Sequence, residues 1–361
     1  MPEFMTTLAT SSTLAPSARA ETQLPSDGVW RQILASRRAV IGGGAMLVII
    51  LTCVLSLPWT GSWNASTSPV QYNEQHGELV RLPPPFAGRP SNIDPPEWAE
   101  LQRKLREHEQ AQHIGNSLWR WFGTDVQARS LLGRCLFGGV ISLLIGFAAA
   151  TISVVLGVTV GLLAGYRGGW VDATLMRIVD ILYGLPYILL VILFRIAFQD
   201  LLARVSWLGP LGANLIVLFL AIGLVSWLTM ARVIRGQVLS LRSQPFVEAA
   251  RAAGVTEWRI FFNHLLPNLV GPIIVYTTLI IPSAILQESF LSFLGVGIQP
   301  PLPTWGSLAS DGLQPALNTL HSDWWLLLFP CTLLAIMLLC LNFLGDGLRD
   351  VFDPKKEASK I

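Results

Sequence analysis

Six long apolar segments constrain this chain more than any other feature of its sequence. They cover, in order, residues 39–57, about 134–164, 174–198, 212–234, 267–290 and 323–345. A bilayer core about 30 Å thick is crossed by about 20 apolar residues in a helix, so each segment is long enough to span it. Because no water reaches the backbone inside a bilayer, segments of this kind are expected to be helical. The sequence therefore predicts an all-α polytopic membrane protein with six transmembrane helices.

The composition excludes several other classes of protein. Only 13% of the 361 residues are charged, against about 25% in a typical soluble domain, while 52% are hydrophobic. The formal net charge of +2 provides no strong field for binding nucleic acid. The four cysteines lie inside apolar segments, and no cysteine or histidine has the spacing of a metal site. We therefore expect no disulfide, no metal site and no cofactor held by this chain.

The distribution of basic residues predicts the orientation in the membrane. Arginines precede the first segment and crowd the loop between the fourth and fifth, and basic residues fill the C-terminal tail. Residues 291–322, by contrast, contain neither Lys nor Arg. Because short loops rich in Lys and Arg stay in the cytoplasm, both termini are predicted to be cytoplasmic.

This orientation divides the chain into five parts. They are a disordered cytoplasmic tail (1–28), a first transmembrane helix (39–57), a long extracytoplasmic insert (58–130), a five-helix core (131–348) and a cytoplasmic C-terminal tail (349–361). Two interpretations of residues 1–4 stay open. They are a cloning remnant before a native start at Met5, or they are part of the native chain.

The insert contains one predicted surface helix. Between Glu97 and Gln112, apolar residues recur at helical spacing among charged ones. Two interpretations stay open: the helix is a docking platform for a partner, or it covers a loop of its own chain.

Glycines and prolines predict local features of the spans. Gly157, Gly161 and Gly165 lie on one face of the second segment, a spacing that lets two helices approach closely. Pro186 and Pro282 are expected to interrupt the third and fifth segments, where neighbouring helices or water must bind the freed carbonyls.

Two ionisable residues are candidates for a substrate path. Arg195 lies near the outer end of the third segment and Glu288 near the outer end of the fifth. Charged groups at membrane depth are costly and usually face the bundle interior or water. The alternatives are snorkelling to the interface and pairing inside the bundle.

The loop between the fourth and fifth segments, residues 243–267, has the strongest local signals. Ser243 or Gln244 can cap a short helix whose first turn accepts a proline, and Gly254 can end that helix in a left-handed conformation. Thr256 is placed to cap a second helix that runs to Pro267, where the fifth segment begins. Alanines at positions 249, 250, 252 and 253 leave the first helix almost without side-chain bulk. Another protein's groove could therefore close tightly around it.

The spacing of this loop resembles the EAA signature of ATP-binding-cassette (ABC) importer permeases. The matching residues are Glu248, Ala249, Ala250, Gly254, Ile260, Leu266 and Pro267. More of the chain, over roughly 120–355, resembles the C-type permease subunit of dipeptide and oligopeptide importers. The further matching motifs are Phe122-Gly123-Thr124-Asp125, the stretches 164–172, 176–180, 288–297 and 342–350, and Asp353-Pro354.

The chain departs from the family pattern in two places. Where the family usually has Gly-Arg-Asp after Gly-Thr-Asp, this chain has Ala128-Arg129-Ser130. The insert between the first two spans is also longer than in ordinary peptide permeases.

The resemblance implies a type I ABC importer-like bundle with a cytoplasmic coupling helix. It makes the seven EAA-loop residues the coupling site for a separate ATPase, and it implies a bacterial inner-membrane location. The implied partners are a second, B-type permease subunit, two ABC ATPase subunits or domains that bind ATP and Mg, and an extracytoplasmic substrate-binding protein. The chain itself is expected not to be an enzyme, since it contains neither a phosphate-binding G-x-x-x-x-G-K-[ST] loop nor a catalytic constellation.

The implied cargo is a peptide, either a di- or oligopeptide or a modified peptide. Nickel chelates and glycosides are the alternatives within the family. An autonomous ion-coupled secondary transporter is a hypothesis from another class, and it would require inverted repeats and buried ionisable pairs near the middle of the membrane. An intramembrane enzyme is a third.

Overall fold

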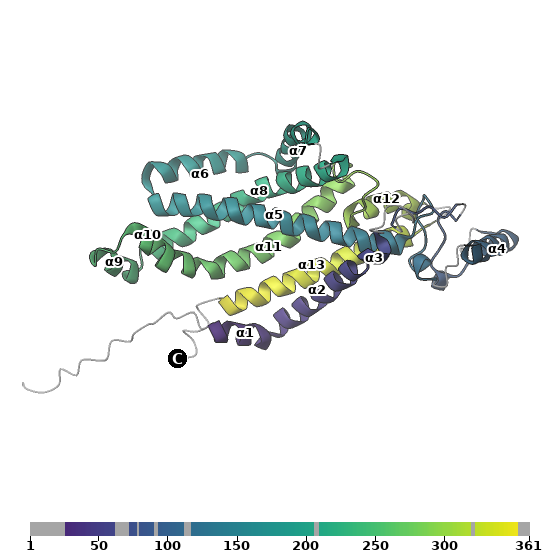
Figure 1. The fold of residues 1–361 in the computed structure, drawn as a ribbon, viewed down its shortest axis with the longest axis horizontal. Helices are drawn as coiled ribbons and strands as arrows, with labels where there is room; N and C mark the ends of the chain where they lie inside the picture. The colour runs from purple at the N-terminus through teal and green to yellow at the C-terminus, as the bar shows by residue number, and fades with distance from the viewer. Residues whose placement is uncertain are drawn as a thin grey trace, which may run out of the picture.

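The computed structural model describes residues 26–61, 72–77, 79–89, 93–111, 117–205, 209–318 and 322–352. Within these ranges the chain is a helical bundle without named strands (Figure 1), and the predicted all-α class is confirmed. The helices are α1 (Ser26–Ala35), α2 (Arg37–Leu55), α3 (Leu57–Thr60), η1 (Pro85–Ala87), α4 (Pro95–Ala111), η2 (Ser117–Arg120), α5 (Leu131–Arg167), α6 (Gly169–Tyr183), α7 (Tyr187–Ala203), α8 (Gly209–Arg242), α9 (Pro245–Ala252), α10 (Glu257–Ile260), η3 (Phe261–Leu265), α11 (Leu266–Phe293), α12 (Trp305–Leu317) and α13 (Trp325–Phe352).

The number and direction of the long helices agree with the predicted topology. Five helical stretches of the described chain are long and apolar enough to cross a membrane, and α6 with α7 form a sixth crossing if the bent pair counts as one span. In Figure 1, α1 and the C-terminal end of α13 lie at the same end of the bundle as α9 and α10, while α4 and α12 lie at the opposite end. The two termini of the bundle and the loop at 243–267 therefore share one side.

The third predicted span, residues 174–198, is interrupted at Pro186, as the sequence predicts. The axes of α6 and α7 meet at 100° across a break of three residues. Pro186 has no amide proton and disfavours a helical conformation at the residue before it, so α6 ends and Pro186 becomes the N-cap of α7. Pro282, in contrast, lies inside the continuous helix α11 and does not interrupt it.

Several predicted boundaries shift by a few residues. Helix α1 begins at Ser26, inside the range 1–28 predicted to be disordered, and the remainder of that range lies outside the described residues. Helix α13 continues to Phe352, four residues beyond the predicted end of the core at 348. The Asp353-Pro354 motif lies outside the described residues.

The glycine face of α5 packs closely against α8. A Cβ atom added to Gly157 would lie 2.5 Å from Cβ of Met230, and one added to Gly161 would lie 2.6 Å from the carbonyl oxygen of Ala231. Gly165 approaches Val238 in the same way. All three partners belong to α8, so the predicted role of these glycines in helix packing is confirmed.

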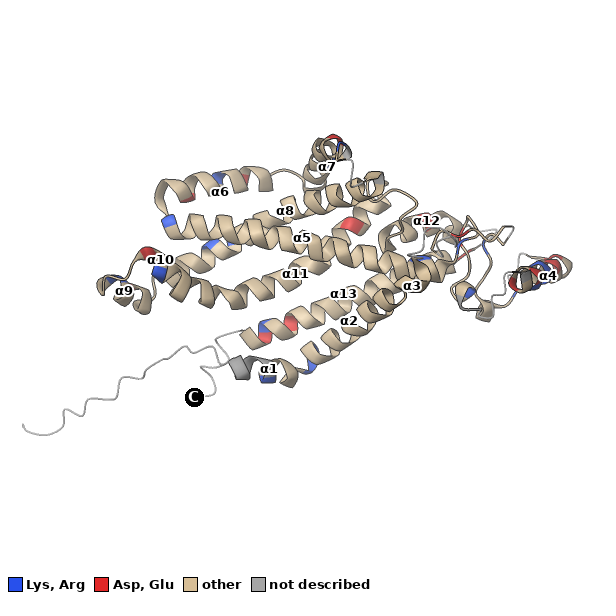
Figure 2. Ribbon diagram, in the orientation of Figure 1, with Lys and Arg blue, Asp and Glu red and all other residues tan. Residues whose placement is uncertain are grey.

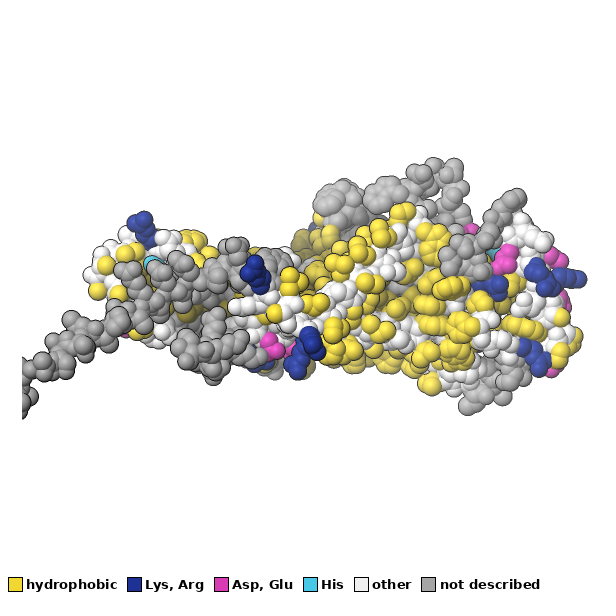
Figure 3. All heavy atoms as spheres, turned by 90° about the horizontal axis from the view of Figure 1, so that it is seen from below, with side chains coloured by type: hydrophobic (Ala, Val, Ile, Leu, Met, Phe, Trp, Pro, Cys, Tyr) yellow, Lys and Arg dark blue, Asp and Glu magenta, His cyan; other side chains and the backbone are white. Residues whose placement is uncertain are grey.

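The outer surface of the bundle suits a lipid environment. Figure 3 shows hydrophobic side chains covering the middle of the face on which α2 and α13 lie, with charged side chains toward both ends. On α2, apolar side chains such as Ile41, Val48 and Leu55 are more than half exposed. Because exposed apolar area of this extent is unfavourable in water, the belt marks the part of the molecule inside the bilayer.

The insert folds back onto its own chain through α4. Leu105 is buried against Leu79, Leu82 and Trp119, and this cluster fixes the helix predicted between Glu97 and Gln112. The apolar stripe of α4 thus covers a loop of the same chain, which is one of the two interpretations left open by the sequence.

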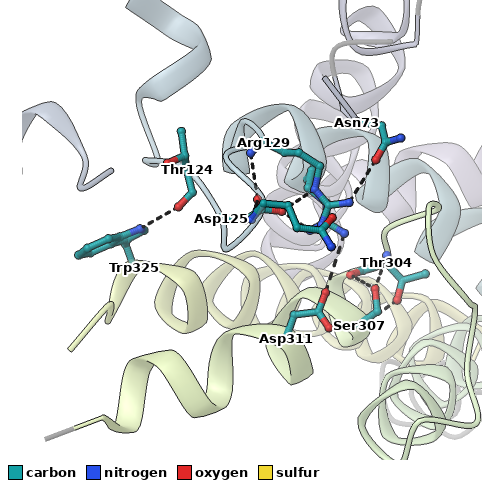
Figure 4. A network of polar contacts seen from close by, with 10 residues as sticks. Asn73, Thr124, Asp125, Arg129, Thr304, Ser307, Asp311 and Trp325 are labelled. Carbon is teal, nitrogen blue, oxygen red and sulfur yellow. Dashed lines mark hydrogen bonds and ion pairs between the residues drawn. The ribbon is translucent and has the colours of Figure 1, made fainter. Parts of the chain in front are cut away.

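A buried ion-pair network joins the insert to α5 (Figure 4). Asp125 accepts hydrogen bonds from Nε of Arg129 at 2.7 Å and from a guanidinium nitrogen of Arg134 at 2.6 Å. Arg134 also approaches Asp311 of α12, at 3.9 Å. The turn before this network places Ala128 at φ 58°, the left-handed region that favours glycine. Ala128 therefore adopts a backbone conformation that residues other than glycine rarely adopt.

Candidate functional site

The short helix α9 forms as the loop sequence predicts. Gln244 is its N-cap in an extended conformation, and Pro245 occupies the first helical position, where a missing amide proton costs no hydrogen bond. Glu248 lies in the first turn, close to the positive end of the helix dipole. The cap is therefore made by the backbone, since the Gln244 side chain makes no capping hydrogen bond.

The end of α9 is a Schellman motif centred on Gly254. The amide of Val255 donates to the carbonyl of Ala250 at 3.1 Å, and the amide of Gly254 donates to the carbonyl of Arg251 at 2.9 Å. Gly254 has φ +75°, and a Cβ atom there would meet no other atom within 4 Å. The glycine is thus required by backbone conformation and not by lack of space, and the predicted elbow is confirmed.

Helix α9 is held against the bundle by a small apolar cluster. Val247, Ile260 and Leu265 are completely buried and pack together, with Ala250 and Val255 partly buried at the edge. Because α9 continues from α8 through two residues and α10 leads into α11, the cluster ties the helix to two long helices at once. Motion of α9 therefore has to move both.

The candidate coupling residues divide into an exposed and a packed group. Glu248 and Ala249 are exposed, as is Gly254, whereas Ala250 is only half-buried and belongs to the apolar cluster. Ile260 is buried, and Leu266 and Pro267 are half-buried where α11 begins. The structure thus brings all seven residues into one region, but only the first group offers a free surface.

The second half of the loop differs from the prediction. No helix boundary separates it from the fifth span, because α10, the π-helical turn η3 and α11 form one continuous stretch from Glu257 to Phe293. The π-helical turn ends just before Pro267. In a regular α-helix the ring of a proline clashes with the carbonyl group four residues earlier. Thr256 is the N-cap by position, but its hydroxyl makes no capping hydrogen bond.

A contact between this loop and α5 was not predicted. The hydroxyl of Tyr166 donates to the carbonyl of Glu257 at 3.0 Å and also to its carboxylate, and Nε of Arg251 donates to the same carboxylate at 3.2 Å. The ring of Tyr166 lies edge-on to Phe261, with 5.7 Å between centroids. Tyr166 lies in a matched family motif, but a pattern of separate motifs does not reveal which of them touch.

Ion pairs fix the same end of the bundle. Arg235 of α8 forms a two-pronged pair with Asp172 of α6, at 2.5 and 2.6 Å, and Arg232 pairs with Asp180 at 2.8 Å. Figure 2 shows basic residues along the ribbon at the end formed by α9, α10 and the turn between α5 and α6.

A cavity of about 580 Å³ lies between α6, α7, α8 and α11. Its lining is mostly apolar, with polar groups from Tyr187, Ser226, Thr229, Tyr276 and Gln287. The hydroxyl of Tyr187, the first residue of α7, donates to the side-chain oxygen of Gln287 of α11 at 2.5 Å. A largely apolar chamber with a few placed polar groups is typical of a small-molecule site.

Arg195 and Glu288 do not line this cavity. A guanidinium nitrogen of Arg195 donates to the carbonyl of Gly297 at 2.9 Å, and Glu288 is completely buried and accepts from the hydroxyl of Ser292 at 2.7 Å. Arg195 therefore joins α7 to the loop after α11, whereas the bond of Glu288 lies within α11, and the place of both residues on a substrate path stays a prediction. Sequence reasoning missed Tyr187 and Gln287, because neither residue type is unusual in a membrane span.

The described residues contain no group of three or more His, Cys, Asp or Glu side chains that could hold a metal ion. The four cysteines, Cys53, Cys135, Cys331 and Cys340, are all free thiols.

Residues 157–358 match the family described as "Binding-protein-dependent transport system inner membrane component". The oligopeptide transport system permease protein OppC of Haemophilus influenzae is 45% identical over 237 residues, which are 66% of this chain and 71% of that protein. OppC of Escherichia coli K12 is 48% identical over 235 residues, 65% and 72% of the two chains. The dipeptide transport system permease protein DppC of Bacillus subtilis is 41% identical over 251 residues, 70% and 73%.

One solved structure with a similar arrangement is that of the MetNI methionine ABC transporter in an inward-facing conformation. A chain of it superimposes with a TM-score of 0.48 at 20% identity, covering 61% of this chain and 97% of that one.

Proposed function

Because this chain belongs to the family of binding-protein-dependent transport system inner membrane components, we propose that it is the permease subunit of an ABC importer for peptides. The family and the apolar helices make it a multi-pass membrane protein and a transport component. The observation that supports the proposal most strongly is the geometry of α9, a stiff helix presented at one end of the bundle and tied to α8 and α11.

In this proposal, α9 is the coupling helix. Glu248 and Ala249 face a groove on a cytoplasmic ATPase, and Gly254 gives the elbow that directs the chain back into the bundle. Ala250, Ile260, Leu266 and Pro267 act from behind, because they pack the helix against the spans. Closure of two ATPase units is a rigid-body motion. Because α9 is rigid, it transmits this motion to the transmembrane helices.

The proposed partners follow from the role of α9 as a coupling helix for a separate ATPase. The chain contains no nucleotide-binding loop, so ATP and Mg would be bound by two ABC ATPase subunits or domains, and no cofactor by this chain. A second, B-type permease would complete the path, and an extracytoplasmic binding protein would deliver the cargo. The complex would lie in a bacterial inner membrane with both termini of this chain in the cytoplasm.

Peptide cargo is supported by the relatives and is compatible with the cavity. Curated relatives of this chain include permeases of oligopeptide and dipeptide transport systems. In the cavity, Tyr187 and Gln287 can donate to and accept from peptide groups, while the surrounding apolar lining tolerates varied side chains. Nickel chelates and glycosides remain the alternative cargoes of the proposal.

Substitution of Gly254 tests the proposal. We expect Gly254→Val to reduce peptide uptake by more than tenfold, because a β-branched residue at φ +75° is strained by more than the 1–2 kcal/mol of an ordinary side chain. Gly254→Asn should retain most uptake, since Asn tolerates this conformation best among non-glycine residues. The measurement is accumulation of a labelled peptide in cells that carry the variant as their sole copy.

Membrane insertion, followed by immunoblot of the membrane fraction, is the control for both variants. Normal uptake by Gly254→Val at an equal membrane level would contradict the coupling role. Peptide transport by the purified chain alone in liposomes without ATP would instead support the autonomous secondary transporter.

A further inference from the structure

A second cavity, of about 700 Å³, lies beside the coupling segment and has no role in the proposed function. The end of α5 and the segment α10–η3 form its walls, and one residue from each of α8 and α9 completes it. Its lining residues are Thr159, Leu162, Leu163, Tyr166, Arg167, Arg242, Arg251, Glu257, Trp258 and Phe261.

One part of this cavity is strongly basic. Three arginines, Arg167, Arg242 and Arg251, line the cavity together with a single carboxylate, Glu257, and that carboxylate already accepts from Tyr166 and Arg251. Within the described chain, Arg167 makes no ion pair or hydrogen bond, and it is exposed. A guanidinium presents five N–H donors in a planar fork, so two arginines here keep most of their capacity to bind an anion.

Arg242 is already placed for such a ligand. One of its guanidinium nitrogens makes only long hydrogen bonds, at 3.3 Å, to the carbonyls of Gly165 and Tyr166. These contacts hold the guanidinium beneath the end of α5 and leave its other nitrogens available. Phosphate oxygens are the ligands that match this fork geometry best.

The rest of the cavity is apolar and continues onto an exposed face of α5. Leu163 is 48% exposed and Val155, two turns earlier, is 59% exposed. Thr159 lies between them, but its hydroxyl donates to the carbonyl of Val155 at 2.6 Å, so its polar group is satisfied within the helix. From the basic end toward the middle of the span, the surface therefore offers only hydrocarbon.

The position of the cavity agrees with this polarity. The last turn of a transmembrane helix is the level at which lipid headgroups lie, and Trp258, 71% exposed at the mouth, is the residue type enriched at that level. Basic pockets between helices on the cytoplasmic side are suited to anionic headgroups.

We propose that this cavity binds one anionic phospholipid of the inner leaflet, with its phosphate at Arg167 and Arg242 and an acyl chain along Leu163, Thr159 and Val155. The occupant is a lipid and not a free phosphate, because the apolar surface extends away from the arginines along the helix. A zwitterionic headgroup would bring an amine next to three guanidinium groups, so the site discriminates in favour of phosphatidylglycerol over phosphatidylethanolamine. The bound lipid would join the end of α5 to the coupling segment.

Lipid titration followed by native mass spectrometry tests this site without any transport measurement. The full chain is purified in mild detergent, with any subunits that remain bound, and titrated with phosphatidylglycerol or phosphatidylethanolamine of matched chain length. We expect one phosphatidylglycerol to bind at least several-fold more tightly than phosphatidylethanolamine. Arg167→Gln should remove that preference, and Arg167→Lys should keep most of it.

Matched variants separate the site from general attraction to basic residues. Arg177→Gln removes an exposed arginine from α6, at the same end of the bundle but outside the cavity, and should leave binding unchanged. Leu163→Gln should weaken phosphatidylglycerol binding without changing charge. Unchanged melting temperature in detergent shows that the variants are folded.

Three results would overturn the proposal. They are equal binding of the two lipids by the wild-type protein, equal loss with Arg167→Gln and Arg177→Gln, and displacement of the lipid by millimolar inorganic phosphate. None of them bears on the coupling role of α9, and loss of that role would leave the lipid measurements unaffected.

Discussion

At the scale of single residues, Asp125 lies in a loop but stabilises the fold through several buried hydrogen bonds and ion pairs. Its carboxylate accepts from the amides of Gln127 and Arg129 and from the side chains of Arg129 and Arg134, and the side chains of all three charged residues are at least 94% buried. Burial by itself raises the pKa of this carboxyl, but the two arginines and two amides outweigh it and hold the pKa below its usual value. The charge network thus fixes the junction between the insert and α5.

Replacement of Asp125 by Asn should destabilise the protein by about 3–5 kcal/mol, because it leaves Arg134 buried without its nearest charge partner. The measurement is thermal or denaturant unfolding in detergent. The stabilisation that Asp125 provides should be complete above about pH 4, the ordinary pKa of Asp, and be lost as the pH falls further. Asp94→Asn, at an exposed position outside the network, is the control. An Asp125→Asn protein as stable as the wild type would contradict the role assigned to the network.

The sequence predicted some of this residue-scale detail and not the rest. Gly254 could be predicted because a left-handed helix end requires a particular residue, and the requirement is local. The partners of Asp125 could not be predicted, since the network depends on which of several arginines the turn brings into contact. The same applies to Tyr166 and Glu257, which are 91 residues apart.

At the scale of elements, periodicity predicted the helices and proline predicted one break. Pro186 breaks the third span, whereas Pro272, Pro282 and Pro330 all lie within helices. The difference is local: Gly184 precedes Pro186 and ends α6 as its C-cap, so two helix-ending signals occur together. The π-helical turn before Pro267 could not be read from composition, because it depends on how one long helix accommodates both its buried face and a proline.

Packing of α5 on α8 gives a prediction with an internal control. Gly161→Ala should destabilise the protein by about 1–3 kcal/mol, because the new Cβ would lie 2.6 Å from a backbone oxygen of α8. Gly236→Ala, in α8 itself, should be neutral or slightly stabilising, since no atom lies within 4 Å of its added Cβ. Thermal unfolding of the two variants in detergent is the measurement. Equal melting temperatures for the two would contradict the proposed close approach.

Helix α4 should detach from the insert as the pH falls. Nδ1 of His76 lies 3.0 Å from Nε2 of His108 on α4, and burial, followed by the charge of His108, lowers the pKa of His76 to about 4. Above its ordinary pKa of about 6.5, His76 is neutral whether or not the insert is folded. Between pH 6.5 and 4 only the unfolded insert binds the proton, so stability falls across this window by up to about 3 kcal/mol.

Hydrogen exchange of the amides in residues 97–111 measures this loss. Protection of α4, relative to α5, should decrease from pH 7 to pH 4.5 after correction for the intrinsic exchange rate. His108→Gln, which keeps a hydrogen-bonding side chain but removes the charge that acts on His76, should weaken the dependence. Protection that does not change with pH in the wild-type protein would contradict the arrangement.

At the scale of the whole molecule, the account describes a bundle with two distinct ends. One end carries α4, α12 and the buried charge network, and the other carries α9, α10 and both termini of the bundle (Figure 1). The apolar segments and the basic loops predicted this polarity, because membrane thickness and charge distribution act on the sequence as a whole. The cavities between helices could not be predicted, since they depend on crossing angles and on the 100° bend between α6 and α7.

The central claim is that a separate ATPase binds α9. Photo-cross-linking from Ala249 tests it most directly. Ala249 is exposed and lies outside the apolar cluster, so a benzophenone amino acid placed there leaves the packing of α9 intact. In native membranes the account predicts a covalent adduct with a protein that contains a G-x-x-x-x-G-K-[ST] loop, and no such adduct from position Arg103 on α4. The claim would be contradicted if Ala249 gave adducts with lipid alone under conditions in which position Arg103 gives adducts with other proteins.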